Sequence, residues 1–373
     1  MSYEIKNENG EINRGNYSNV AKVFEKAKKG EAIKVAFLGG SITQGCLSSV
    51  PETCYSYLVY DWFVKTFKES EIEYINAGIG GTTSQYGAAR VKEHVLDKNP
   101  DFLLIEFAVN DENNIFFRET YEGLVRKVLY SDNAPAVLLM NNVRYDDCTS
   151  AEDMHIQVAK HYDLPMVSMK PTILPEVKGG QIKNREITED DLHPNDAGHS
   201  LVANVIIYEL EKILKSYESG ETVPSDGVLA KEPLTLNGYE NSSMYTALNS
   251  KPVLNGFKAD PNEKEYFLDI YKNGWTADKT GDSISFEIEG TGVAIQYRKS
   301  VNKPAPIAEV IVDGDLSTKK MLNANFDEDW GDCLFIETVT SHMNPGKHKV
   351  DITITEAHED DKVPFYLVSV IGS

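Results

Sequence analysis

The sequence predicts two domains, an α/β domain built on a parallel sheet and an all-β sandwich that follows it. Three observations lead to this prediction. The chain has 373 residues, which is more than one ordinary hydrophobic core accommodates. Up to about residue 215, apolar runs alternate with segments of helical periodicity, and after about residue 228 the apolar period becomes two. Residues 217–227 (YESGETVPSDG) are rich in Ser, Gly, Pro and acidic side chains, so we place the domains at residues 1–225 and 226–373.

In the first domain, predicted helices and strands alternate along the chain. The first helix, residues 16–30, has apolar residues at helical spacing and ends at a glycine, which is typical of a helix C-terminus. The predicted strands cover residues 32–40, 72–78, 101–110, 135–143 and 165–169. The other predicted helices cover residues 55–70, 87–99, 118–131, 150–163 and 195–217. Continuous apolar strands between amphipathic helices indicate a parallel sheet with helices on both faces.

In the second domain, short apolar runs with a period of two are divided by Gly, Asn, Asp and Pro. The predicted strands cover residues 283–290, 292–299, 307–315, 333–340, 347–356 and 365–372. Many short strands of this kind, with turn residues between them, are typical of an all-β sandwich.

The composition argues against several classes of function. The net charge is −21 and the isoelectric point is near 4.8, so the field of the protein repels phosphate backbones and anionic membrane surfaces. We therefore expect neither a nucleic-acid partner nor a membrane partner. No apolar run approaches the roughly 18 residues of a membrane span, and no basic stretch followed by an apolar one suggests a signal peptide. The four cysteines are scattered without a CxxC pattern, which fits a cytoplasmic protein.

The sequence predicts no metal site and no cofactor. It contains no HExxH motif and no clustered carboxylate motif. The segment GGSITQG lacks the lysine of a phosphate-binding loop, and it does not match GxGxxG. His155 and His161 fall on a predicted amphipathic helix and are expected at the surface, whereas His199 is expected to pack or cap within the last helix.

A candidate nucleophile follows the first predicted strand. In residues 35–45 (VAFLGGSITQG), Ser41 comes directly after an apolar run and two glycines. In a parallel sheet the ligand crevice lies beyond the carboxyl ends of the strands. The loop of residues 76–83 and Asn110, which follow the second and third strands, should lie along the same edge. Ser41 could act as a nucleophile if a base takes its proton.

The candidate base is His193, in the polar segment ITEDDLHPND before the last helix. Asp190 lies three residues earlier, a spacing that in a turn brings a carboxylate and an imidazole to one side. It could hold the ring in the tautomer whose other nitrogen is free for the serine. Asp191 could compete for that role.

An ester-cleaving serine also needs hydrogen-bond donors for the tetrahedral oxyanion. The glycine-rich segment NAGIGGTTSQ offers Gly81 as one backbone donor, and the Ser41 N–H would be a second. Asn110 follows a buried strand and could supply a third donor from its side-chain amide.

Taken in order, the segments GGSIT, NAGIGGTT, AVND and DDLHP resemble the four signature blocks of the SGNH (GDSL-like) hydrolases. The resemblance spans about residues 33–215. It implies a three-layer α/β/α domain with a five-stranded parallel sheet and a serine esterase with a Ser-His-Asp triad. By motif, Ser41 matches the nucleophile, His193 the base and Asp190 the orienting acid.

The same resemblance assigns the oxyanion hole to the Ser41 N–H, the Gly81 N–H and the Asn110 side chain. Two residues depart from the family pattern. Gly40 replaces the aspartate of the GDSL string, and Ala108 stands where many members have glycine. Neither departure removes a catalytic atom.

The order of the two domains also resembles that of bacterial carbohydrate esterases, notably acetylmannan and acetylxylan oligosaccharide esterases. This resemblance implies that the substrate is an acetylated oligosaccharide from a plant polysaccharide and that the second domain is carbohydrate-binding-like. Since we see no secretion signal, we expect this oligosaccharide to be imported. Two alternatives stay open. The protein could be another short-chain esterase or lysophospholipase, or a non-catalytic carbohydrate-binding protein.

Trp330, in the segment NFDEDWGD, is the candidate sugar-binding residue of the second domain. Loops at the end of a sandwich are natural binding positions, and an indole offers a flat apolar face with one N–H donor. Acidic neighbours able to accept hydrogen bonds from sugar hydroxyls are Asp327, Glu328, Asp329 and Asp332. Trp275 is the alternative, and Trp330 could instead be buried between the two domains for structural reasons.

Overall fold

The computed structural model describes residues 3, 5–225 and 229–373, and within it the chain divides into two compact units, Met1–Asn237 and Gly238–Ser373. The predicted domain boundary lies between residues 225 and 226, and residues 226–228 lie outside the described residues. Residues 231–235 belong to the first unit because they are tied to its helix α5 (Ile115–Leu129). Glu122 on this helix accepts a hydrogen bond from the Thr235 N–H (2.8 Å).

The first unit is built on a mostly parallel sheet with strand order β1-β6-β5-β4-β2-β3. The strands are β1 (Glu11–Asn13), β2 (Ile33–Gly39), β3 (Ile72–Gly78), β4 (Phe102–Glu106), β5 (Ala136–Asn141) and β6 (Met166–Ser168). Strands β2 to β6 pair in parallel, which confirms the predicted five-stranded parallel sheet. Strand β1 was not predicted; it adds to the edge of the sheet, antiparallel to β6.

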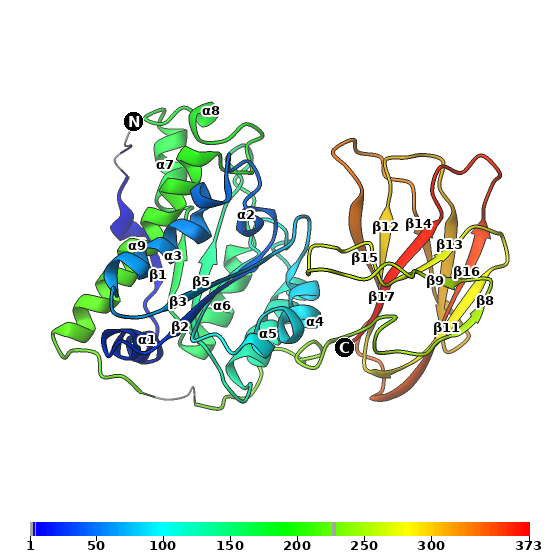
Figure 1. The fold of residues 1–373 in the computed structure, drawn as a ribbon, viewed down its shortest axis with the longest axis horizontal. Helices are drawn as coiled ribbons and strands as arrows, with labels where there is room; N and C mark the ends of the chain where they lie inside the picture. Colours follow the sequence, from blue (N-terminus) through cyan, green and yellow to red (C-terminus); the bar gives the residue numbers. More distant parts are fainter. Residues whose placement is uncertain (1–2, 4, 226–228) are drawn as a thin grey trace. The chain divides into compact units, whose positions relative to one another are not determined.

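Helices cover both faces of this sheet (Figure 1). Their bounds are α1 (Ser18–Lys28), α2 (Ser41–Gln44), α3 (Tyr55–Thr66), α4 (Ser84–His94), α6 (Glu152–Tyr162), α7 (Ile173–Lys178), α8 (Asn184–Ile187) and α9 (Asp196–Glu218), in addition to α5. Successive strand residues face opposite layers. Phe37 packs with α1, α3 and α9, whereas Leu38 packs with α4, α5 and α6. The three-layer α/β/α fold expected from the sequence is therefore confirmed. No helix in the described part of the chain is long and apolar enough to cross a bilayer.

The second unit consists of two antiparallel sheets, drawn from yellow to red in Figure 1. One sheet has the order β15-β12-β17-β10-β9, with β7 paired to β17, and the other has the order β14-β13-β16-β11-β8. The strands are β7 (Ser243–Tyr245), β8 (Val253–Asn255), β9 (Lys258–Ala259), β10 (Trp275–Ala277), β11 (Ser283–Gly290), β12 (Val293–Lys299), β13 (Ile307–Val312), β14 (Asp315–Asn323), β15 (Cys333–Thr340), β16 (Gly346–Glu356) and β17 (Phe365–Gly372). Their inward side chains form one apolar core. The all-β prediction is confirmed, although β7 to β10 and β14 were not predicted.

Candidate active site

The first predicted site residue lies where β2 ends. The strand stops at Gly39, and Ser41 is the first residue of the short helix α2. This helix packs directly onto the end of β3, where a Cβ at Gly78 would lie only 2.2 Å from the Gln44 backbone nitrogen. Glycine at position 78 therefore permits a close approach that a side chain would prevent.

The structure brings Ser41, His193 and Asp190 together, although 152 residues separate the serine from the histidine. Ser41 Oγ lies 2.8 Å from His193 Nε2, and His193 Nδ1 lies 2.6 Å from Asp190 Oδ2. The other carboxylate oxygen of Asp190 accepts a hydrogen bond from the His193 backbone N–H (2.7 Å). These contacts leave Nε2 directed at the serine hydroxyl, the arrangement in which an imidazole can accept its proton.

Asp191, the alternative to Asp190, makes different contacts. Its carboxylate pairs with the Arg185 guanidinium (Nη2 to Oδ2, 2.6 Å) and accepts a hydrogen bond from the Asn184 amide. Its backbone adopts the left-handed conformation (φ 66°), in a chain reversal between the two carboxylates. The carboxylate in contact with the His193 ring is that of Asp190.

The electrostatic surroundings of His193 favour its charged form. Burial lowers the pKa of His193, but electrostatic interactions with Cys46 and Asp190 outweigh it and raise the pKa to about 9. The side chain of His193 is 18% exposed. Interaction with His193 also lowers the pKa of Asp190, against the effect of burial. The neutral ring, which is the form that can take the serine proton, therefore becomes more populated as the pH rises toward 9.

The predicted oxyanion loop runs beside α2. Gly81 adopts a left-handed conformation (φ 68°), which glycine reaches without steric cost. The Gln44 side chain accepts a hydrogen bond from the Gly80 N–H (2.6 Å), and the Asn76 amide donates to the Thr43 carbonyl (2.8 Å). The glycine loop is thus held against the helix that begins at Ser41.

Asn110 lies on the other side of the nucleophile. A Cβ at Gly40 would be 2.3 Å from Asn110 Oδ1, so the amide rests against the backbone that directly precedes Ser41. In this chain, a side chain at position 40 would therefore displace the Asn110 amide. Ser41, Gly81 and Asn110 thus lie on adjoining segments, and their role as an oxyanion hole stays a prediction.

Contacts that the sequence analysis did not identify join the nucleophile segment to the base segment. The Asp196 carboxylate, at the start of α9, accepts hydrogen bonds from the Ser49 N–H (2.8 Å) and the Thr53 hydroxyl (2.6 Å). His199 is buried one turn later, with Nδ1 facing the Tyr55 N–H and Nε2 facing the Cys46 carbonyl. Asp196 and His199 are polar residues in the first turns of a long helix, and this pattern is visible in the sequence. Their partners could not be predicted, because they lie in a distant segment, residues 46–55.

The expected surface position of His155 is wrong. Its side chain is fully buried, because it lies on the inner face of α6. Its ring stacks on Tyr121 (centroids 3.6 Å apart), and its two nitrogens lie 3.1 Å from Asn141 Oδ1 and from Asp111 Oδ2. His161 remains near the surface, where Nε2 contacts the Glu232 carbonyl.

The two tryptophans considered for sugar binding have different surroundings. Trp330 lies on a loop between β14 and β15 and is 58% exposed, with its ring edge-on to Phe326. Its indole N–H donates to Glu328, so this carboxylate already has a partner. Trp275 is buried in the sandwich core against Phe286 and is therefore wrong as the alternative sugar-binding residue.

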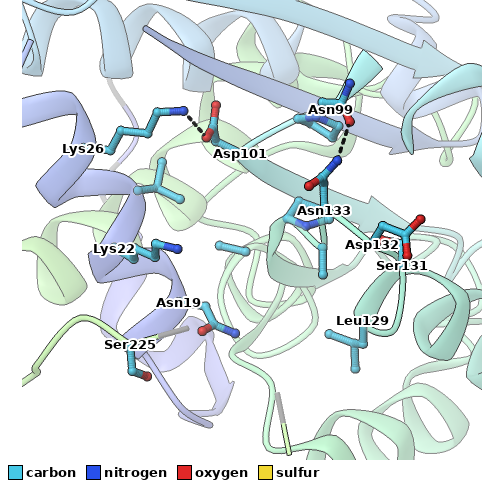
Figure 2. Close-up of a pocket in the computed structure, with 15 residues that line it drawn as sticks. Asn19, Lys22, Lys26, Asn99, Asp101, Leu129, Ser131, Asp132, Asn133 and Ser225 are labelled. Carbon is cyan, nitrogen blue, oxygen red and sulfur yellow. Dashed lines mark hydrogen bonds and ion pairs between the residues drawn. The ribbon is translucent and has the colours of Figure 1, made fainter. Parts of the chain in front are cut away.

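A cavity of about 680 Å³ lies at the amino-terminal ends of the parallel strands, near the starts of β4 and β5 (Figure 2). An ion pair between Lys26 and Asp101 (2.6 Å) and a hydrogen bond between Asn133 and Asn99 (3.0 Å) lie in its wall. None of the predicted site residues lines it. The ligand crevice of a parallel sheet is expected at the carboxyl ends of the strands, where Ser41 lies, so we do not assign the catalytic site to this cavity.

The chain is similar to known hydrolases in sequence and in structure. Residues 37–201 match the GDSL-like lipase/acylhydrolase family. The thioesterase 1/protease 1/lysophospholipase L1 of Escherichia coli K12 is 26% identical over 186 residues, which are 48% of this chain and 83% of that protein.

The whole chain is similar to a two-domain esterase (CEX) active on acetylated mannans, crystallised with mannopentaose. The identity is 54%, the TM-score is 0.95, and the match covers 100% of this chain and 98% of the other. A second crystal structure of that esterase matches with the same identity and TM-score.

Proposed function

The chain belongs to the GDSL-like lipase/acylhydrolase family, and from that premise we propose that it is a serine esterase that removes O-acetyl groups from mannan-type oligosaccharides. The observation that carries the proposal is the series of contacts from Ser41 Oγ to His193 Nε2 (2.8 Å) and from His193 Nδ1 to Asp190 Oδ2 (2.6 Å). Such a series is the arrangement that activates a serine hydroxyl.

In the proposed reaction, Ser41 Oγ attacks the carbonyl carbon of the acetyl group while His193 takes the hydroxyl proton. The Ser41 and Gly81 N–H groups and the Asn110 amide stabilise the oxyanion of the tetrahedral intermediate. His193 then gives the proton to the sugar oxygen, and the deacetylated sugar leaves. A water molecule, deprotonated by His193, then attacks the acetyl-serine carbonyl. The bond from the acetyl carbon to Ser41 Oγ breaks, His193 returns the proton to Ser41 Oγ, and acetate leaves. Asp190 holds the ring orientation and stabilises the imidazolium that forms twice in this cycle.

The substrate class rests on the full-length similarity. The structurally similar esterase is active on acetylated mannans and was crystallised with mannopentaose, and the match extends over both units of this chain. We propose a mannan-type oligosaccharide on this basis, with xylan-type oligosaccharides as the closest competitors. The four cysteines are free, which is consistent with a reducing compartment, and we propose a cytoplasmic enzyme that acts on imported oligosaccharides.

For the second unit we propose a part in holding the sugar, with Trp330 as the contact residue. Its exposed indole could lie against the apolar face of a sugar ring. Asp332, two residues further on, accepts hydrogen bonds from Ser300 Oγ (2.7 Å) and the Val301 N–H (3.1 Å). We therefore assign Asp332 to holding the loop rather than to the sugar.

A substrate panel tests the proposed function. Acetylated mannan, xylan and pectin oligosaccharides and a long-chain acyl ester are each incubated with the enzyme, and release of acetate or fatty acid is followed by mass spectrometry. Mannan oligosaccharides should lose acetyl groups fastest. Faster hydrolysis of the long-chain ester would instead favour a lysophospholipase-like enzyme.

A further inference from the structure

A fully buried arginine lies beneath the two loops that carry the proposed backbone oxyanion donors. Arg90 is on α4, and its side chain is 0% exposed. Nη1 donates a hydrogen bond to the Ala77 carbonyl (2.6 Å), and Nη2 donates one to the Gly39 carbonyl (2.9 Å). One guanidinium therefore bridges two adjacent strands.

These two carbonyls lie at the ends of β2 and β3, where the ladder between the strands stops. The parallel pairing of β2 with β3 ends at Gly39 and Gly78. One further backbone hydrogen bond follows, from the Ile79 N–H to the Gly39 carbonyl (3.1 Å). Beyond this point the chain leaves as two separate loops. Ser41 lies two residues after Gly39, and Gly81 lies four residues after Ala77.

The surroundings of Arg90 differ from those of a structural ion pair. Among the described residues, no carboxylate forms an ion pair with its guanidinium, and Nε has no hydrogen-bond partner. Tyr86 offers its ring face at 5.3 Å, and His94 Nδ1 lies 3.5 Å from Nη1. Burial lowers the pKa of Arg90 to about 10, so it remains charged at neutral pH. Burial of a charge without an opposite charge is costly, which argues against a contribution to stability alone.

We propose that Arg90 is a positioning residue that fixes the distance between the Ser41 loop and the Gly81 loop. The proposal rests on the proposed function, because it assumes that both N–H groups bind the same oxyanion. The two guanidinium nitrogens hold the two carbonyls in a fixed planar geometry, which the single, flexibly attached nitrogen of lysine does not reproduce. Oxyanion donors lose much of their effect when displaced by about 1 Å, so loosening this bridge should slow the chemical step and leave substrate binding unchanged.

The test compares Arg90→Lys with wild type on a small aryl acetate, well below both melting temperatures. The turnover number should fall roughly 10- to 100-fold while KM changes less than about twofold. A trifluoromethyl ketone, which forms a tetrahedral adduct with an active serine, should bind more weakly by the same factor. Val91→Ala, a core truncation on the same helix, is the matched control. It should lower the melting temperature without this loss of turnover.

The proposal is overturned if Arg90→Lys keeps turnover and inhibitor affinity within twofold of wild type, or if Val91→Ala loses as much turnover at an equal loss of melting temperature. If Arg90→Lys does not fold, Arg90→Gln, which is uncharged and has one amide donor group, gives the same comparison. Ser41→Ala separates the two levels of inference. An active wild type, an inactive Ser41→Ala and a normal Arg90→Lys would reject the positioning role alone, whereas an inactive wild type would reject the proposed function.

Discussion

Ser41 Oγ lies 2.8 Å from Nε2 of His193, and the other ring nitrogen is engaged by Asp190. Since Nδ1 meets a carboxylate, the neutral ring carries its proton there and leaves Nε2 as the acceptor. The three-residue spacing of Asp190 and His193 made this pair predictable from the sequence. The neighbouring Asp191 could not be excluded in that way, because its left-handed backbone and its pairing with Arg185 depend on the folded loop.

Asp190→Asn should therefore lower the turnover number by several orders of magnitude, on the order of 10⁴, because the amide favours the wrong tautomer while keeping the shape. Asp191→Asn is the matched control on the adjacent residue and should have a much smaller effect, through the loop alone. Steady-state kinetics on an aryl acetate measure both. A larger loss for Asp191→Asn would reverse the two roles.

The pH dependence should report the raised pKa of His193. Because only the neutral imidazole accepts the serine proton, kcat/KM should rise with pH, with a midpoint above the usual histidine value of about 6.5 and near 9. Cys46→Ala removes a side chain whose electrostatic interaction raises this pKa and should move the midpoint to lower pH. Cys333→Ala, in the second unit, should leave it unchanged. A midpoint that Cys46→Ala does not move would show that Cys46 has no influence on the base.

At the scale of elements, the site is formed by the ends of three parallel strands and the loops that follow them. The apolar runs and glycine-rich turns made β2, β3 and β4 and their loops predictable. The contacts between the loops were not predictable, because the Gln44, Asn76 and Arg90 side chains act on partners in other elements. A local pattern shows where a chain turns, but it does not show which side chain holds the turn.

Gly40 and Asn110 should be energetically coupled across two of these loops. Asn110→Ala should lower the turnover number roughly 10²–10³-fold, the usual cost of one oxyanion donor. Gly40→Ala should cost about tenfold or more, since its Cβ would lie 2.3 Å from Asn110 Oδ1 and must displace the amide. In the Asn110→Ala background, Gly40→Ala should then add little further loss. Additive losses in this double-mutant cycle would mean that Gly40 acts independently of Asn110.

In the second unit, the strands that were predicted are those with inward apolar residues at every second position, such as β11 and β13. Strand β14 was missed because it lies at a sheet edge and is almost entirely exposed, so its sequence shows no such alternation. Strands β7 to β10 have at most three residues each, which is too short for a period of two to be recognised. These strands were missed because β14 lies at a sheet edge and β7 to β10 are short, and not because their residues are unusual for strands.

At the scale of the whole molecule, the net charge of −21 is compatible with a neutral sugar substrate. It is unfavourable for phosphorylated or polyanionic ligands, and it repels the acetate that the proposed reaction releases. Because the two units have separate cores, the proposed chemistry of the first and the proposed sugar binding of the second can be tested independently.

Trp330→Ala should separate these two contributions. The variant should hydrolyse a small aryl acetate at the wild-type rate but lose roughly tenfold or more on acetylated oligosaccharides, about 1.4 kcal/mol of binding. Its melting temperature should not change, because the indole is exposed. Equal losses on the small and the large substrate would reject sugar binding by Trp330.

The most direct measurement is the deacetylation of one acetylated mannan oligosaccharide by wild type and by Ser41→Ala, with circular dichroism to verify that both are folded. Mass spectrometry counts the acetyl groups that remain on the sugar. Wild type should remove them, and Ser41→Ala should be slower on the order of 10⁶-fold, the usual loss when a triad nucleophile is removed. Deacetylation by Ser41→Ala within tenfold of wild type, or an active aryl esterase that leaves the mannan oligosaccharide untouched, would contradict the proposed function.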